Sequence, residues 1–134
     1  MPSGSCLCGA INFEYTGEPA ITAVCHCKDC QKWAGAAAST NVVVPHAQFK
    51  ITKGTPKKHV SIPDSGKPYP RFFCGDCGTS LYGQPEGMDG LTVIKAGTLD
   101  NGAADIPMAA ELYIKDRVSF MKPVDGALQK EMMP

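Results

Sequence analysis

The stretch Phe72-Phe73-Cys74-Gly75-Asp76-Cys77-Gly78-Thr79 places a pair of closely spaced cysteines in a turn that follows an aromatic segment. Residues 71–73 are expected to lead into the turn as one strand, and residues 80–82 to lead out of it as another. Thiolates spaced by one or two residues can converge on one ion, because a tight turn points both sulfurs to one side. This strand–turn–strand pattern is how zinc ribbons hold their metal, and it predicts a metal-bound β structure.

The other cysteines form two further clusters, which read Cys6-Leu7-Cys8 and Cys25-His26-Cys27-Lys28-Asp29-Cys30. The total of 7 cysteines is odd, so one four-ligand site and one three-ligand site are the natural partition. A closed zinc site with four thiolates is structural, whereas a three-ligand site leaves one coordination position open for chemistry. Soft thiolates select zinc, copper(I) or iron–sulfur clusters, and this partition favours two zinc ions.

Spacing also suggests which cysteines share an ion. The central cluster can supply three ligands from one short segment, Cys25, Cys27 and Cys30. The remaining two pairs, Cys6/Cys8 and Cys74/Cys77, are each followed by glycine, which accepts positive φ and lets backbone N–H groups approach the sulfurs. Joining these pairs closes a long loop, where a metal contributes most to stability. A ribbon that pairs Cys27/Cys30 with Cys74/Cys77 is the alternative.

Composition places residues 1–134 in a single globular domain, with 43% hydrophobic and 19% charged residues. The 14 glycines and 11 prolines predict many turns and short elements, which favours a mainly β architecture. The formal net charge is +0, and seven thiolates holding two zinc ions would make it about −3. Neither value is the basic footprint of a nucleic-acid-binding protein.

Nothing in the chain suggests a membrane or a secreted protein. No stretch approaches the roughly 20 apolar residues that span a bilayer, and residues 1–5 show no basic segment followed by an apolar one. We therefore expect a cytoplasmic protein. In that reducing compartment cysteine clusters indicate metal binding or catalysis, and the odd cysteine count also argues against disulfides.

The pattern predicts strands over residues 10–15, 20–24, 39–44 and 91–96, with a last long element over 109–114. Residues 28–33 are expected to form a short helix that stops at Gly35. Strands over 49–53 and 57–62 flank Gly54-Thr55 and are expected to form a hairpin. Loops are expected over 63–68 and 97–105.

With these cysteine clusters the chain resembles the glutathione-dependent formaldehyde-activating enzyme family, which includes the centromere protein V domain. The resemblance rests on the three cysteine clusters with their flanking residues and on Gly97-Thr98-Leu99-Asp100, and it covers residues 4–120. It implies a β-tent fold of antiparallel sheets with a structural zinc ion. It assigns that ion to Cys6, Cys8, Cys74 and Cys77, and a catalytic zinc ion to Cys25, Cys27 and Cys30.

The resemblance also implies a carbon–sulfur lyase or synthase that adds glutathione to formaldehyde and gives S-hydroxymethylglutathione. Its partners would be a glutathione-like thiol and an aldehyde. The alternatives are a thiol carrier without turnover, a lyase acting on a larger thioether or glutathione conjugate, and a non-catalytic interaction module. Where many members have a histidine and a tryptophan near the C-terminus, this chain has Glu111 and Phe120.

The chemistry of an open zinc site with three thiolates favours thiol capture over water activation, because the formal charge of the site is about −1. A donor must then stabilise the oxygen of the aldehyde as charge develops. The sequence offers four candidates for this donor, Lys28, Lys32, Arg71 and a backbone N–H within residues 27–29.

Other side chains near the clusters have less specific signals. Trp33 is expected in the core rather than in the wall of a substrate pocket, and the side chain of His26 is expected to point away from the metal. Asp29 is a candidate for proton transfer or for capping the helix. Four further basic residues, His46 and the run Lys57-Lys58-His59, are expected to be solvated.

Overall fold

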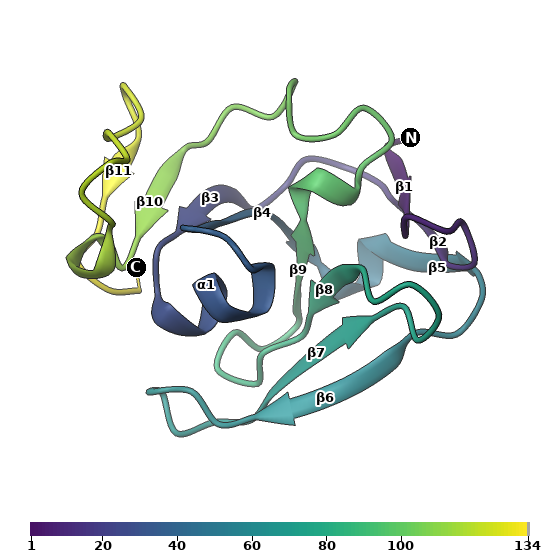
Figure 1. The fold of residues 1–134 in the computed structure, drawn as a ribbon. Helices are drawn as coiled ribbons and strands as arrows, with labels where there is room; N and C mark the ends of the chain where they lie inside the picture. Colours follow the sequence, from purple (N-terminus) through teal and green to yellow (C-terminus); the bar gives the residue numbers. More distant parts are fainter. Residues whose placement is uncertain (134) are drawn as a thin grey trace.

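The computed structural model describes residues 1–133, which fold into two β-sheets with one α-helix lying against the larger sheet (Figure 1). The smaller sheet has the strand order β1 (Ser3–Ser5), β2 (Asn12–Tyr15) and β5 (Phe49–Lys53). The larger sheet has the order β11 (Leu128–Gln129), β10 (Ala110–Leu112), β3 (Ile21–Cys25), β4 (Ser39–Pro45), β9 (Leu91–Lys95), β8 (Ser80–Gly83), β7 (Tyr69–Phe73) and β6 (Lys57–Ser61). The expected mainly β class is thus confirmed.

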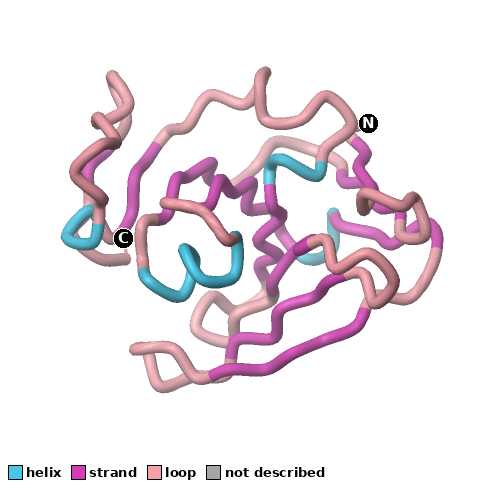
Figure 2. Tube along the Cα trace, in the orientation of Figure 1, coloured by secondary structure: helices cyan, strands magenta, loops and turns pink. Residues whose placement is uncertain are grey.

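The helices are short and mark the ends of strands (Figure 2). Helix α1 (Lys28–Ala34) begins directly after the central cysteine segment, and Gly35 ends it in the left-handed conformation at φ 63°. This agrees with the expected helix and its stop, because glycine adopts positive φ without a Cβ penalty. Three 3-10 turns follow strands, η1 (His46–Gln48), η2 (Ala96–Thr98) and η3 (Ile114–Asp116).

The main hydrophobic core lies between the two sheets. Phe13 of β2, Val42 and Val44 of β4, Leu81 of β8 and Ile94 of β9 are almost fully buried there. A second, smaller cluster surrounds the central cysteines and includes Ala23, Cys25, Cys30, Ala110 and Leu112. The central cysteines therefore pack against side chains of the larger sheet in a cluster that is separate from the main core.

The expected hairpin between residues 49–53 and 57–62 is wrong, although both strands form. Strand β5 pairs with β2, while β6 pairs with β7 in the other sheet. Phe49 and Ile51 pack against the main core, which draws β5 toward β2. Gly54 turns the chain at φ 78° so close to residue 10 that a Cβ would lie 2.2 Å from the carbonyl oxygen of Ala10. Burial of apolar side chains outweighs the local turn signal here.

The end of the chain also differs from expectation. A long element was expected over residues 109–114, but strand β10 has only three residues, and the short elements η3 and β11 follow it. It pairs in parallel with both β3 and β11, whereas the resemblance implied antiparallel sheets throughout. A long connection after η2 crosses one end of the molecule and allows this parallel pairing (Figure 1).

Candidate functional site

The four-cysteine cluster joins two turns that are far apart in sequence. Cys6 and Cys8 lie between β1 and β2, and Cys74 and Cys77 lie between β7 and β8. All four sulfur atoms lie within 4.8 Å of one another. The Sγ atoms of Cys6 and Cys8 are 3.6 Å apart, and those of Cys8 and Cys74 are 3.8 Å apart. Four thiolates placed tetrahedrally at about 2.3 Å from zinc lie about 3.8 Å from each other, so this cluster fits a zinc ion.

Backbone amides surround these sulfurs. The N–H of Ile11 donates to Cys6 Sγ at 3.2 Å, and the N–H of Asp76 donates to Cys74 Sγ at 3.4 Å. The glycines that follow the pairs, Gly9 and Gly78, have φ values of 80° and 81°. The expected role of glycine after each pair is therefore confirmed, because this conformation favours glycine and permits the tight turns.

The three-cysteine cluster comes from one continuous segment. Cys25 ends β3, Cys27 caps α1 and Cys30 lies in its first turn, and their sulfurs all lie within 4.8 Å of one another. The N–H of Cys30 donates to Cys27 Sγ at 3.2 Å, so the sulfur replaces the usual oxygen of a helix cap. The sulfurs thus gather as four and three within residues 1–133. The alternative grouping of Cys27/Cys30 with Cys74/Cys77 does not form.

One face of the larger sheet carries the surroundings of this three-cysteine cluster. Cys25 lies opposite Ser39 in the pairing of β3 with β4, and Asn41 lies opposite Lys95 in the pairing of β4 with β9. Because directly paired residues share a face and residues two apart along a strand do too, Cys25, Ser39, Asn41 and Lys95 all point the same way. Lys95 is only 8% exposed, and its Nζ donates to Asn41 Oδ1 at 2.6 Å.

A chain of hydrogen bonds leads from Lys95 through Asn41 to Ser39, and each residue donates to the next. Lys95 can only donate, so Asn41 turns its oxygen to Lys95 and its Nδ2 to Ser39 Oγ at 3.0 Å and Ala23 O at 3.1 Å. Ser39 Oγ already accepts from Asn41, and its hydroxyl is therefore free to donate to the sulfur of Cys30. Hydrogen bonds with Cys25 and Cys27, the charge of Lys95 and the Ser39 hydroxyl together lower the pKa of Cys30.

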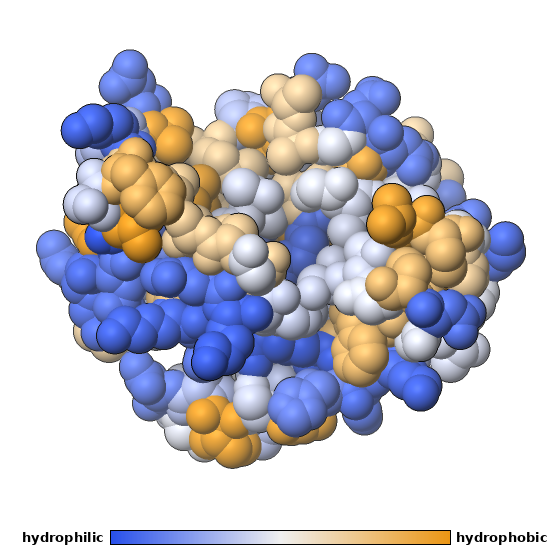
Figure 3. All heavy atoms as spheres, viewed as in Figure 1, coloured by the Kyte–Doolittle hydropathy of each residue, from blue (hydrophilic) through white to orange (hydrophobic). Residues whose placement is uncertain are grey.

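An open groove borders this face. Its volume is about 470 Å³, and Lys32, Trp33, Ser39, Ser80, Lys95 and Thr98 are among its lining residues. The view in Figure 3 shows a hydrophilic area between α1 and β9, surrounded by residues of intermediate hydropathy. Trp33 was expected in the core, but it is only half-buried and lines the groove. That expectation is wrong, because Trp33 packs against charged groups rather than against the apolar core.

Two cations contact the Trp33 ring. Lys95 Nζ lies 4.5 Å from the ring centroid and the guanidinium of Arg71 lies 5.3 Å from it. Arg71 also covers the ring of Tyr69 at 4.1 Å and donates to the hydroxyl of Ser61. Burial lowers the pKa of Lys95, while the neighbouring Cys30 and Cys25 act in the opposite direction. Burial outweighs these charges, so the pKa of Lys95 lies below its ordinary value.

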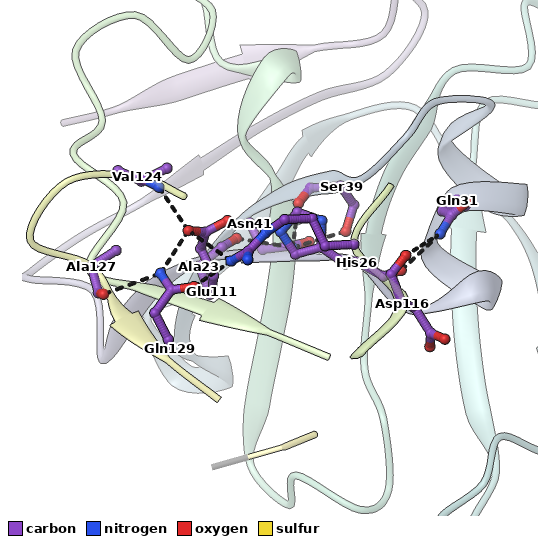
Figure 4. A network of polar contacts seen from close by, with 11 residues as sticks. Ala23, His26, Gln31, Ser39, Asn41, Glu111, Asp116, Val124, Ala127 and Gln129 are labelled. Atoms are coloured by element: carbon purple, nitrogen blue, oxygen red, sulfur yellow. Dashed lines mark hydrogen bonds and ion pairs between the residues drawn. The ribbon is translucent and has the colours of Figure 1, made fainter. Parts of the chain in front are cut away.

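A buried network lies behind the three-cysteine cluster (Figure 4). His26 is fully buried and its Nε2 lies 2.8 Å from Glu111 Oε1. The other carboxylate oxygen accepts from the N–H of Val124 and from Gln129 Nε2, both at 2.7 Å, and Arg117 lies 3.3 Å away. His26 therefore points away from the metal site, as expected. Glu111 attaches the C-terminal segment to the central cysteine loop.

The environment of Glu111 determines its charge. Burial raises the pKa of this carboxyl group, but hydrogen bonds from Gln129, His26 and the Val124 N–H, together with the charge of Arg117, outweigh burial and hold the pKa at about 2. The carboxylate is therefore ionised at neutral pH. Because a carboxylate only accepts hydrogen bonds, His26 carries its proton on Nε2.

The other predicted side chains lie outside this cluster. Lys28, Asp29 and Lys32 are exposed on α1, and Asp29 does not cap the helix, because Cys27 does. The basic residues expected to be solvated are confirmed as exposed, His46, Lys57, Lys58 and His59. Phe120 is 77% exposed. Sequence reasoning missed Lys95, whose signal is a lysine at the end of a strand that is otherwise apolar except for Thr92.

Comparisons with known proteins agree with this arrangement. A family model described as "Glutathione-dependent formaldehyde-activating enzyme" matches residues 1–116. The chain belongs to this family. The resemblance that the cysteine motifs indicated is therefore confirmed.

Curated relatives cover part of the chain. A protein of Aspergillus flavus named "Putative glutathione-dependent formaldehyde-activating enzyme" is 33% identical over 90 residues, which are 64% of this chain and 46% of the relative. A protein of the same name from Podospora anserina is 35% identical over 86 residues, 61% of this chain and 39% of the relative. An uncharacterized lyase of Schizosaccharomyces pombe is 32% identical over 85 residues, 59% of this chain and 54% of the relative. The matched regions are thus about half of these relatives or less.

A solved structure shows the same fold. The crystal structure of a Rhodobacter sphaeroides protein matches with a TM-score of 0.57 and 14% identity, and the match covers 96% of this chain and 98% of the other. Within residues 1–133, no helix is long and apolar enough to cross a membrane.

Proposed function

We propose that this protein is a zinc-dependent carbon–sulfur lyase or synthase that interconverts a thiol, an aldehyde and their adduct. Glutathione, formaldehyde and S-hydroxymethylglutathione are the proposed reactants and product. The observation that carries the proposal is the convergence of the sulfurs of Cys25, Cys27 and Cys30. They lie on the sheet face whose residues Ser39 and Lys95 line an open groove. Membership in the glutathione-dependent formaldehyde-activating enzyme family supports the same chemistry.

The two cysteine clusters take different roles in this proposal. The sulfurs of Cys6, Cys8, Cys74 and Cys77 lie within 4.8 Å of one another and would hold a structural zinc ion. Cys25, Cys27 and Cys30 would hold the second ion with one position left for a substrate. Zinc bound there supplies a site that accepts the sulfur of the substrate thiol and lowers the pKa of that thiol.

Other side chains of the protein would stabilise the thiolate, position the substrate and hold the cysteine loop in place. The Ser39 hydroxyl lowers the pKa of Cys30 and so supports its thiolate form. Trp33 and the hydroxyl groups of Ser80 and Thr98 line the groove, where they can exclude water and position a small polar substrate. Glu111 holds His26 and keeps the cysteine loop attached to the C-terminal segment.

The test is exchange NMR with glutathione and formaldehyde. The zinc-loaded protein should interconvert free glutathione and S-hydroxymethylglutathione faster than the uncatalysed reaction does. Cys27→Ser should abolish this acceleration, because it removes one of the three ligands, whereas Lys28→Met on the exposed side of α1 should retain it. Native mass spectrometry should find two zinc ions in the wild-type protein and in Lys28→Met.

The other outcomes separate the alternatives. Glutathione binding without acceleration would indicate a thiol carrier. Acceleration with a bulkier glutathione conjugate but not with formaldehyde would indicate a different lyase. Absence of glutathione binding, with both zinc ions present, would contradict the proposal and leave the interaction module.

A further inference from the structure

We propose that Lys95 is the catalytic group that stabilises the oxygen of the aldehyde when the carbon–sulfur bond forms. The inference rests on the proposed function and names a residue for a step that the family assignment leaves open. It comes from the position of Lys95 in the sheet, from its burial and from its hydrogen bonds.

The position of Lys95 follows from strand register. Lys95 is paired with Asn41, and Asn41 lies two residues from Ser39, which is paired with Cys25. These side chains share one face of the sheet, which places the ammonium group on the same side as the three sulfurs. Lys95 also lines the groove together with Ser39. A substrate thiol at the cysteine cluster would therefore present its bound aldehyde toward Lys95.

Burial makes this lysine unusual. Lys95 is 8% exposed, and buried lysines are rare because a desolvated ammonium group costs free energy unless it is paired. Within residues 1–133, Asn41 Oδ1 is the acceptor that receives a hydrogen bond from Nζ, and the Trp33 ring lies 4.5 Å from it. An ammonium group has three N–H bonds, so it keeps donor capacity for an oxygen in the groove.

The other candidates fit this role less well. Lys28 and Lys32 are exposed, so water screens their charge. Arg71 donates to Ser61 and stacks on Tyr69. The backbone N–H groups of residues 27–29 carry only a partial positive charge, in contrast to an ammonium group. Lys95 alone combines a full charge, a buried site and a place in the groove wall among these candidates.

The chemical step balances without a redox partner. The substrate thiol gives its proton to solvent, and its sulfur lone pair forms the new bond to the carbonyl carbon. The π electrons of the carbonyl group move to oxygen, which receives a proton from the Lys95 ammonium group. Lys95 then regains a proton from water, and the sum is thiol plus aldehyde giving the hydroxymethyl thioether.

The test compares Lys95→Met with Lys28→Met in the zinc-loaded protein. Methionine keeps the length and volume of the lysine stem but removes the donor. Lys95→Met should lower the exchange rate by about 10²–10³-fold, the range seen when one oxyanion donor is removed. Zinc content and the dissociation constant for glutathione should change less than about threefold, because a transition-state contact affects rate and not ground-state binding.

A second readout does not depend on turnover. Formate is an oxyanion of the size of formaldehyde, and its binding to the zinc-loaded, glutathione-saturated protein can be followed by NMR titration. Lys95→Met should weaken formate binding at least about tenfold, whereas Lys28→Met should not change it. If Lys95→Met fails to fold, Lys95→Arg replaces it, and the displaced donor should still lower the exchange rate at least tenfold.

The outcomes separate this inference from the function on which it rests. Wild-type exchange that Lys95→Met leaves unchanged would overturn the inference and leave the proposed function standing. Formate binding that persists in Lys95→Met would also overturn it. If the wild-type protein does not accelerate exchange, the proposed function fails and the catalytic role of Lys95 fails with it, even where formate binding depends on Lys95.

Discussion

The two cysteine clusters both present sulfur atoms, but they differ in the sequence separation of their members and in the groups that surround them. The four-cysteine cluster joins turns 66 residues apart, has two exposed members, Cys8 and Cys77, and receives hydrogen bonds from backbone amides. The three-cysteine cluster comes from one local segment, and buried side chains such as Ser39 and Lys95 surround it. This difference supports the proposal that the four-cysteine cluster stabilises the fold and that the three-cysteine cluster is available for a substrate.

The largest expected effect comes from removing one ligand of each cluster. Cys74→Ser should lose the structural zinc ion and unfold or destabilise the protein by several kcal/mol, because metal binding at a long-range closure is coupled to folding. Cys27→Ser should retain the fold and one zinc ion, because its cluster closes no long loop. Native mass spectrometry and thermal unfolding measure both effects. Equal destabilisation by the two variants would contradict the comparison.

A smaller effect is expected at the buried network behind the three-cysteine cluster. Glu111→Gln leaves one oxygen where two accepted hydrogen bonds from His26, Val124 and Gln129, and it removes the charge that pairs with Arg117. At least one buried donor then loses its acceptor, which should lower the free energy of unfolding by about 2 kcal/mol at neutral pH. Urea unfolding measures this loss, and zinc content shows whether the cysteine loop has moved.

The same variant has a pH signature. The pKa of Glu111 is lowered from 4.5 to about 2 in the folded protein, so its contribution to stability is present above about pH 4.5 and is lost as pH falls toward 2. The stability difference between wild type and Glu111→Gln should therefore shrink across this range. A difference that stays constant from pH 5 to about pH 2 would contradict the lowered pKa.

The smallest effect is expected at the glycine after the last cysteine pair. Gly78 has φ 81° and open space around its Cβ position, so Gly78→Ala should cost about 1 kcal/mol through backbone strain alone. Gly126→Ala is the matched control, because Gly126 has φ 79° and similar open space. Both should lower stability equally, but Gly78→Ala alone should increase zinc release to a chelator. Equal zinc release from Gly78→Ala and Gly126→Ala would contradict a role of the Gly78 turn in metal retention.

Local patterns predicted much of the structure. The alternation in residues 10–15 and the glycine at position 35 predicted β2 and the end of α1, because both depend on neighbours in sequence. The hairpin at residues 49–62 was wrong, since the partner of β5 is chosen by burial of Phe49 and Ile51. Trp33 was misplaced for a related reason, because the cations that contact its ring, Arg71 and Lys95, come from distant strands.

The sequence by itself determined the three short cysteine segments and the family to which the chain belongs. Those features are local, because a turn of a few residues is enough to bring neighbouring sulfurs together. The tertiary structure decided what surrounds the open cluster. Strand register places Lys95, Asn41 and Ser39 on the face that carries Cys25, and Glu111 reaches His26 across 85 residues of chain. Register depends on the packing of the whole sheet, which no short stretch of sequence specifies.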